Sequence, residues 1–246
     1  MYERFFFLKE HPFHITPDPK FLYLSEKHQE ALNLFYFGIL EKKGFILLTG
    51  EVGTGKTTLC RAILDRLDKK VETALILNPL LSDFDLLWAI NEDFGIRVNG
   101  TSMKEHLDAL NLFLLKKAEE KGNAVVIIDE AQNLNPKTLE MIRLLSNLET
   151  EKTKLLQIAL VGQPELRDKL KLPELRQLNQ RVIVRYHLKP LNLEETKFYI
   201  FNRLAVAGGR GNVRFTIPAL QRIYGASYGI PRLINVICDR TLMVAF

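Results

Sequence analysis

Cysteine is scarce in this chain of 246 residues, which contains only Cys60 and Cys238. Both lie in apolar, periodic segments far apart in the sequence, a pattern that favours buried thiols over a disulfide framework. Thiols that stay reduced indicate a reducing compartment, so the expected location is cytoplasmic. The five histidines show no spacing with cysteine or carboxylate that is typical of a metal site, and we expect them to be structural or surface residues.

Long apolar runs are also absent. No segment approaches the roughly 18 apolar residues that a membrane helix needs, so we expect no membrane span in this chain. Charged residues flank the apolar triplet 5–7, which argues against a signal peptide or an anchor there. With 47% hydrophobic and 26% charged residues, the chain has the composition of a globular protein with one large or two modest domains.

One glycine-rich motif dominates the sequence. An apolar run of strand character at 45–49 leads into Gly-Glu-Val-Gly-Thr-Gly-Lys-Thr-Thr, a complete phosphate-binding loop of the pattern G-x-x-x-x-G-K-[ST]. Its glycines let backbone N–H groups turn inward around a phosphate, and the following helix presents its N-terminal N–H groups to the same anion. We expect Lys56 to reach the β- and γ-phosphates of a nucleotide and the Thr57 hydroxyl to ligate Mg²⁺. The expected nucleotide-binding residues are Gly50, Glu51, Val52, Gly53, Thr54, Gly55, Lys56, Thr57 and Thr58.

Apolar runs alternate with helix-compatible segments through most of the chain. The expected strands are 45–48, 73–77, 124–128, 154–161 and 182–188, and the expected helices are 26–40, 59–67, 82–93, 102–120 and 137–148. This alternation predicts parallel strands joined by right-handed crossovers, and therefore an α/β fold with a parallel five-stranded sheet flanked by helices. The prolines among the aromatic residues of 1–24 predict an extended arm rather than a helix.

The pattern changes near Pro190, after which it predicts helices only. We therefore expect two domains: residues 1–190, an arm with a nucleotide-binding α/β domain, and residues 191–246, a helical lid domain. Most of the net charge of +5 lies in the second, which has seven basic and three acidic residues (7 − 3 = +4). This excess indicates either a nucleic-acid or acidic-membrane contact, or arginines used on the nucleotide and on neighbouring subunits.

Two carboxylates follow the expected strand 124–128. We expect this strand to lie beside the phosphate-loop strand, so that Asp129 ligates Mg²⁺ together with Thr57. Glu130 would then orient or deprotonate the attacking water. Phosphoryl transfer spreads negative charge that arginines neutralise, and the candidates are Arg176, Arg181 and Arg185 before strand 182–188 and Arg232 at a helix start after Pro231.

These motifs together resemble the AAA+ ATPases. The residues that carry the resemblance are Gly50–Thr58, Asp129–Leu134, Leu160–Leu166, Gln180–Arg181 and Gly229–Asn235. More narrowly, the chain is similar to the general secretion pathway protein A family, whose members power assembly of bacterial envelope machines such as the type II secretin and some pili. The arm strengthens this likeness through Pro12-Phe13, Pro17–Pro19, Phe21–Ser25 and His28–Ala31. The resemblance covers nearly the whole chain and implies a P-loop NTPase fold with a C-terminal helical lid.

The resemblance also implies roles for single residues. Gln163 would be sensor 1, which aligns the water and the γ-phosphate, and Asn78 would engage Glu130 until the partner binds. Arg181 would be the arginine finger for the neighbouring subunit's ATP, with Arg176 as the alternative. Arg232 would be sensor 2, reaching the γ-phosphate from the lid. The catalytic set implied in this way is Glu130, Lys56, Gln163, Arg181 and Arg232.

Three functions stay open at this point. The leading interpretation is a cytoplasmic AAA+ ATPase that hydrolyses Mg²⁺-ATP between subunits of a homo-oligomer and acts on a protein partner in envelope-complex assembly. A DNA-handling ATPase of the transposition or initiator type shares the same layout, and a nucleotide-gated scaffold without turnover is the third, although Glu130 and Gln163 argue against it.

Members of the secretion family usually continue past the ATPase into a membrane helix and a peptidoglycan-binding region. This sequence ends at Phe246, within the expected last lid helix. We therefore expect either a shortened chain or an ATPase-only relative, and a place at the inner-membrane face only if the natural chain continues into an anchor.

Overall fold

The computed structural model describes residues 2–16, 18–77, 79, 81–150 and 153–246. They form two compact units, each described here by itself. One consists of Glu30–Thr49 and Cys60–His187, and the other of Met1–Gln29, Gly50–Leu59 and Leu188–Phe246. Each unit contains its own cluster of buried apolar side chains.

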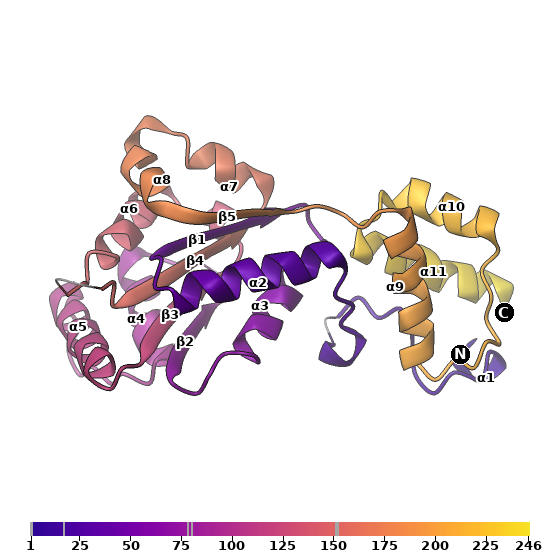
Figure 1. Cartoon of the computed structure of the whole chain (residues 1–246), viewed down its shortest axis with the longest axis horizontal. Coiled ribbons are helices and arrows are strands. Elements are labelled where there is room, and N and C mark those ends of the chain that lie inside the picture. The colour runs from indigo at the N-terminus through magenta and orange to yellow at the C-terminus, as the bar shows by residue number, and fades with distance from the viewer. Residues whose placement is uncertain (1, 17, 78, 80, 151–152) are drawn as a thin grey trace. The chain divides into compact units, whose positions relative to one another are not determined.

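A five-stranded parallel sheet forms the centre of the first unit. Its strands are β1 (Phe45–Gly50), β2 (Val71–Ile76), β3 (Asn123–Ile128), β4 (Leu156–Gly162) and β5 (Val182–Leu188). Their order is β2-β3-β4-β1-β5 (Figure 1). The expected parallel sheet is confirmed, but the expectation that β3 lies beside β1 is wrong, because β4 pairs with both of these strands. An apolar run indicates a buried strand without indicating its neighbour.

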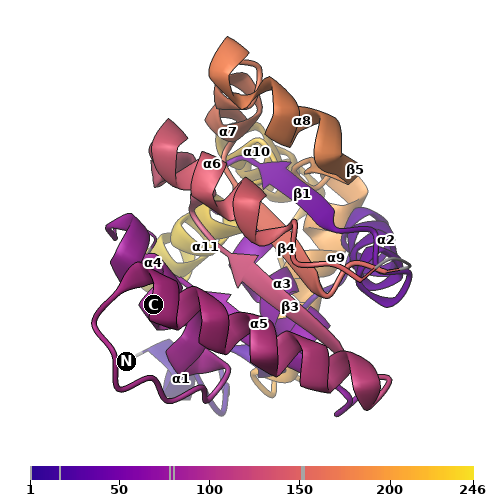
Figure 2. The ribbon, with the colours of Figure 1, turned by 90° about the vertical axis from the view of Figure 1, so that its left-hand side faces the viewer.

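Helices cover both faces of this sheet (Figure 2). On one face lie α4 (Asp83–Asp93), α5 (Met103–Glu119) and α6 (Pro136–Leu145), and on the other lie α2 (Glu26–Leu40) and α3 (Lys56–Leu64). Side chains of α4 to α6 share a core with Phe45 and Leu47 of β1. Ile46 points to the opposite face, where its Cδ1 is 2.8 Å from the position that a Cβ on Gly38 of α2 would take. The alternation along β1 therefore separates the two helical layers.

The predicted helix starts are confirmed where a side chain caps the backbone. The Ser82 hydroxyl accepts from the backbone N–H of Asp85, and Ser102 forms a reciprocal capping box with Glu105. Asn135 caps α6 in the same way. Such caps satisfy N–H groups that have no partner within the helix, which explains why these three starts could be predicted to within a residue.

Four short elements of the same unit were not predicted. They are η2 (Ala131–Asn133), α7 (Pro164–Lys169), η3 (Pro173–Leu175) and α8 (Arg176–Arg181). Each has at most six residues, which is fewer than two helical turns and too short for apolar periodicity to show.

The second unit joins the N-terminal arm to the C-terminal helices. Its elements are α1 (Tyr2–Phe5), η1 (Pro19–Phe21), α9 (Leu193–Val206), α10 (Ile217–Ser227) and α11 (Pro231–Ala245). Tyr2, Phe13 and Phe21 are buried in one core with α9 and α11. The expectation of an arm without helix is wrong for Tyr2–Phe5, because burial of the Tyr2 ring and its 2.6 Å hydrogen bond to Asp239 hold one helical turn in place.

Arg203 of α9 fastens the arm to this unit. Its guanidinium donates to the Pro12 carbonyl at 2.5 Å and to the His14 carbonyl at 3.2 Å, and it lies 4.6 Å from the centre of the Phe21 ring. A charge with only 6% of its side chain exposed is tolerated because its donors are satisfied in this way.

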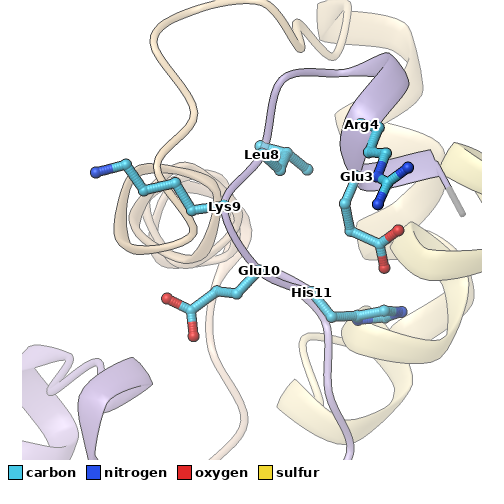
Figure 3. A pocket seen from close by; sticks show the side chains of 6 residues that line it. All are labelled: Glu3, Arg4, Leu8, Lys9, Glu10 and His11. Carbon is cyan, nitrogen blue, oxygen red and sulfur yellow. The ribbon is translucent and has the colours of Figure 1, made fainter.

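A hollow of about 680 Å³ lies on the arm of this unit. It is lined by Glu3, Arg4, Leu8, Lys9, Glu10 and His11. Figure 3 shows Lys9 and Glu10 pointing away from Glu3, Arg4 and His11. Because its charged groups diverge and carry both signs, the hollow lacks the convergent polar groups of a ligand site.

Candidate functional site: a phosphate loop and a glutamate held by two glutamines

The phosphate loop leaves the end of β1 and closes on itself. The Lys56 ammonium donates to the carbonyls of Gly50 at 2.8 Å and Glu51 at 3.0 Å, and the Thr54 hydroxyl donates to Glu51 at 2.8 Å. Helix α3 begins at Lys56, so the N–H groups of its first turn point toward the loop. A buried ammonium inside a loop at a helix N-terminus is suited to a phosphate.

A histidine in the first turn of α2 supports this loop. His28, 5% exposed, has its Nε2 3.0 Å from the Thr54 carbonyl and its Nδ1 2.8 Å from the Ser25 hydroxyl. A carbonyl only accepts, so the proton of the neutral ring lies on Nε2. Burial lowers the pKa of His28 and outweighs the hydrogen bond to Thr54, which raises it. His28 is therefore a neutral brace of the loop backbone.

Arg232 contacts the same loop from the C-terminal helices. Its backbone N–H donates to the Gly53 carbonyl at 3.3 Å, and its side chain is exposed. Pro231 occupies the first turn of α11, where its fixed φ and missing N–H are compatible with a helix start. One compact unit thus contains the phosphate loop, His28 and Arg232.

Asp129 and Glu130 follow β3 in the other unit. Asp129 is 2% exposed, and its Oδ1 accepts from the Glu130 N–H at 2.9 Å. Glu130 has φ 52° and ψ 33°, a left-handed conformation that is uncommon outside glycine. Its Oε2 accepts from Gln163 Nε2 at 3.3 Å, and Gln163 directly follows β4. The structure thus brings together Glu130 and the residue predicted as sensor 1.

Arg181 and Arg176 differ in their surroundings. Arg181, the last residue of α8, donates through Nη1 to Asn147 Oδ1 at 2.6 Å and to the Ser146 hydroxyl at 2.8 Å. Arg176, the first residue of α8, is exposed. The guanidinium of Arg181 is therefore oriented by hydrogen bonds within its own chain.

Two residues of this region were missed as functional candidates. Gln132 donates from Nε2 to Glu130 Oε2 at 2.5 Å, and the spacing Asp-Glu-Ala-Gln was the only signal for it. His28 was expected to be structural or on the surface, and nothing in its spacing indicated contact with the loop. Asn78, the residue expected to engage Glu130, lies outside the described residues.

Thr57 and Asp129, the two predicted magnesium ligands, lie in different compact units. Their side chains carry hydroxyl and carboxylate oxygens, the kind of donor that Mg²⁺ takes in proteins together with substrate phosphates. Within the described ranges, no three His, Cys, Asp or Glu side chains gather as a metal-binding group. In the same part of the chain, no helix has the length and apolar character to cross a membrane.

Comparison with known proteins adds a family and a fold. A family model described as an AAA domain matches residues 39–170, more than half of the chain. General secretion pathway protein A of Aeromonas hydrophila is 49% identical over 247 residues, which cover 100% of this chain and 45% of that protein. The chain thus spans less than half the length of this relative.

Solved structures similar to this chain include a Walker-type ATPase and two ORC proteins. A Walker-type ATPase of Pyrococcus abyssi has a TM-score of 0.68 at 19% identity, covering 96% of this chain and 72% of that one. The ORC2 protein of Aeropyrum pernix, in ADPNP and ADP complexes, has a TM-score of 0.67 at 20% identity, covering 96% of this chain and 67% of that one. The ORC1 protein of the same organism, in complex with DNA, has a TM-score of 0.67 at 18% identity, covering 96% of this chain and 64% of that one. These likenesses confirm the predicted fold.

Proposed function

Because the chain belongs to the AAA+ ATPase family, we propose that it binds ATP with Mg²⁺ and hydrolyses it between two copies of itself, to drive assembly of a bacterial envelope complex. The contact between Gln163 and Glu130 carries this proposal. A protein that only binds nucleotide needs a phosphate loop, whereas hydrolysis also needs a base for the water.

In this proposal the phosphate loop 50–58 holds the phosphates. Lys56 breaks its hydrogen bonds to the carbonyls of Gly50 and Glu51 and turns its ammonium to the β- and γ-phosphates. The charged phosphate oxygens are stronger acceptors for the ammonium than the two neutral carbonyls. Thr57 and Asp129 would hold Mg²⁺, which would withdraw charge from the phosphate oxygens when bound. Arg232 adds a positive charge from the start of α11.

Glu130 acts on the water. Its carboxylate takes the proton of the attacking water, and Gln163 beside it aligns that water with the γ-phosphate. Arg181 reaches the γ-phosphate in the neighbouring subunit, so that a homo-oligomer is needed for full turnover. The hydrogen bonds from Arg181 to Asn147 and Ser146 support this role, since they orient the guanidinium before the partner arrives.

Two substitutions test the ATPase assignment. Lys56→Ala should abolish ATP binding, measured by the fluorescence of a labelled nucleotide. Glu130→Gln keeps the size of the side chain and removes the base, so it should retain binding and stop hydrolysis. A Glu130→Gln protein that turns over ATP at the wild-type rate would exclude Glu130 as the base, and wild-type protein that binds without turnover would favour a nucleotide-gated scaffold.

The envelope role rests on the similarity to General secretion pathway protein A. It implies a protein partner and a location in the cytoplasm or at the inner-membrane face. Residues 1–190 would then be the arm and nucleotide-binding domain, and 191–246 the lid whose movement is coupled to the partner.

A DNA-handling ATPase is the second candidate, favoured by the charge of +4 over residues 191–246. Its exposed arginines are Arg210, Arg214, Arg222, Arg232 and Arg240. Phosphate contacts by these side chains would give a DNA affinity that falls steeply as salt rises. DNA-stimulated ATPase activity would support this candidate, and the lack of DNA binding at low salt would exclude it.

A further inference from the structure

Both polar atoms of the Gln132 side-chain amide form hydrogen bonds. Its Nε2 donates to Glu130 Oε2 at 2.5 Å, and its Oε1 accepts from the backbone N–H of Gln163 at 3.0 Å. A carboxylate accepts and a backbone N–H donates, so the amide has only one orientation that satisfies both partners. Gln132 therefore bridges the residue proposed as base and the turn that carries sensor 1.

The place occupied by this amide is built by two further residues. Lys169 of α7 donates to the backbone carbonyls of Gln132 and Leu134, and these two hydrogen bonds hold η2 against α7. At the end of β4, Gly162 has no side chain where the amide lies: a Cβ there would be 2.6 Å from Gln132 Oε1. The amide therefore fits only because residue 162 is glycine.

Glu130 depends on such support more than an ordinary glutamate does. Its left-handed backbone aims the side chain away from the helical direction. Of the two amides on Oε2, that of Gln132 is closer, at 2.5 Å against 3.3 Å for Gln163. A flexible carboxylate held by one short charge-assisted hydrogen bond keeps one position.

We propose that Gln132 is a positioning residue for Glu130: it holds the carboxylate at a fixed place relative to Gln163, so that the base and sensor 1 face the attacking water together. This inference rests on the proposed ATPase function. It makes Gln132 act through Glu130, with no contact of its own to the nucleotide.

Three variants test it. Gln132→Met keeps the length of the side chain and removes both hydrogen bonds. Gln132→Glu keeps an acceptor for the Gln163 N–H and replaces the donor to Glu130 with a second carboxylate, which repels that of Glu130. Gly162→Ala leaves Gln132 in the sequence and displaces its amide. Asn133→Ala is the matched control, because Asn133 is exposed in the same turn and the structure gives its side chain no hydrogen bond among the described residues.

All three variants should lower kcat about 10- to 100-fold, the loss expected when a base is misplaced by about 1 Å. KM and nucleotide affinity should stay near those of the wild type, and Asn133→Ala should match the wild type throughout. The melting temperature should stay near that of the wild type in Gln132→Met and should fall in Gly162→Ala, because the new Cβ would also lie 3.0 Å from Leu166 Cδ2. In a crystal structure of Gln132→Met, Glu130 should have left its position beside Gln163.

Different results overturn the inference and the proposed function. A wild-type kcat in Gln132→Met overturns the inference. A wild-type kcat in Gln132→Glu also overturns it, because the side chain of residue 132 would then serve only to connect η2 with the end of β4. A Glu130 that stays beside Gln163 in the Gln132→Met crystal overturns it without any assay of turnover. The proposed function is tested separately, by comparing the ATPase rate of the wild type with that of Glu130→Gln.

Discussion

The glycine before the α11 helix offers the sharpest test of the structure of the C-terminal helices. Gly229 has φ +73°, and a Cβ added to it would lie 1.9 Å from the carbonyl oxygen of Leu191. Its own carbonyl accepts from the Leu191 N–H at 2.9 Å. In Gly229→Ala the backbone must therefore move away from Leu191 and lose this hydrogen bond, because a carbonyl cannot rotate aside as a flexible side chain does.

The magnitude follows from these contacts. The left-handed conformation costs a non-glycine residue about 1–2 kcal/mol, and the lost hydrogen bond adds about 1 kcal/mol, so Gly229→Ala should lower the free energy of unfolding by about 3 kcal/mol once backbone strain is included. For a protein of this size the melting temperature should fall by about 6–12 °C.

Gly225 in α10 is the matched control. It lies four residues earlier, and a Cβ there would meet nothing within 4 Å. Gly225→Ala should raise the free energy of unfolding by about 0.5–1 kcal/mol, since alanine loses less entropy in a helix. Calorimetry on both variants should thus give shifts of opposite sign. A Gly229→Ala protein that melts within about 1 °C of the wild type would refute the close approach to Leu191. An equal decrease in the melting temperatures of both variants would refute it as well.

The remaining predictions concern Arg181 and His28. Arg181→Ala should leave nucleotide affinity nearly intact and cut steady-state turnover by a factor on the order of 10³, while Arg176→Ala should leave turnover nearly unchanged; the reverse ranking would assign the finger to Arg176. Burial lowers the pKa of His28 from its ordinary value of 6.5, so the unfolded chain takes up a proton that the folded chain does not, and stability present above pH 6.5 is lost as the pH falls below it. His28→Gln should therefore flatten the decrease in urea-unfolding free energy between about pH 7 and about pH 5; an unchanged slope would contradict the buried neutral ring.

Local signals in the sequence predicted individual elements well. Helix α2 occupies the predicted residues 26–40, and β5 the predicted 182–188. The helix 102–120 was predicted from its leucine-rich pattern, which placed Leu110, Leu112, Leu114 and Leu115 on or near one apolar stripe. Leu110 and Leu114 are buried as expected, since they are four residues apart and share one helix face, whereas Leu112 and Leu115 are exposed.

Relations between elements were harder to predict. The order of strands depends on how crossovers pack, and the strands carry no mark of their neighbours, so β4 between β1 and β3 could not be foreseen from the apolar runs. The phosphate loop and Asp129-Glu130 were evident from their motifs. The contacts of Gln132 and His28 were not, because they depend on a left-handed backbone at residue 130 and on the position of the start of α2 beside the loop.

The unit that contains the phosphate loop is assembled from distant parts of the chain, residues Met1–Gln29, Gly50–Leu59 and Leu188–Phe246. During synthesis the segments of the α/β unit, up to His187, emerge from the ribosome before the helices that Tyr2 and Phe13 pack against. Domains can fold as they emerge, whereas contacts between distant segments must wait. The arm therefore exposes its aromatic residues until α11 has been made, and the hydrogen bond from the Arg232 N–H to the Gly53 carbonyl is among the last contacts to form. A nascent chain that stops before Pro231 lacks the Arg232 contact with Gly53, so translation itself delays the last support of the phosphate loop.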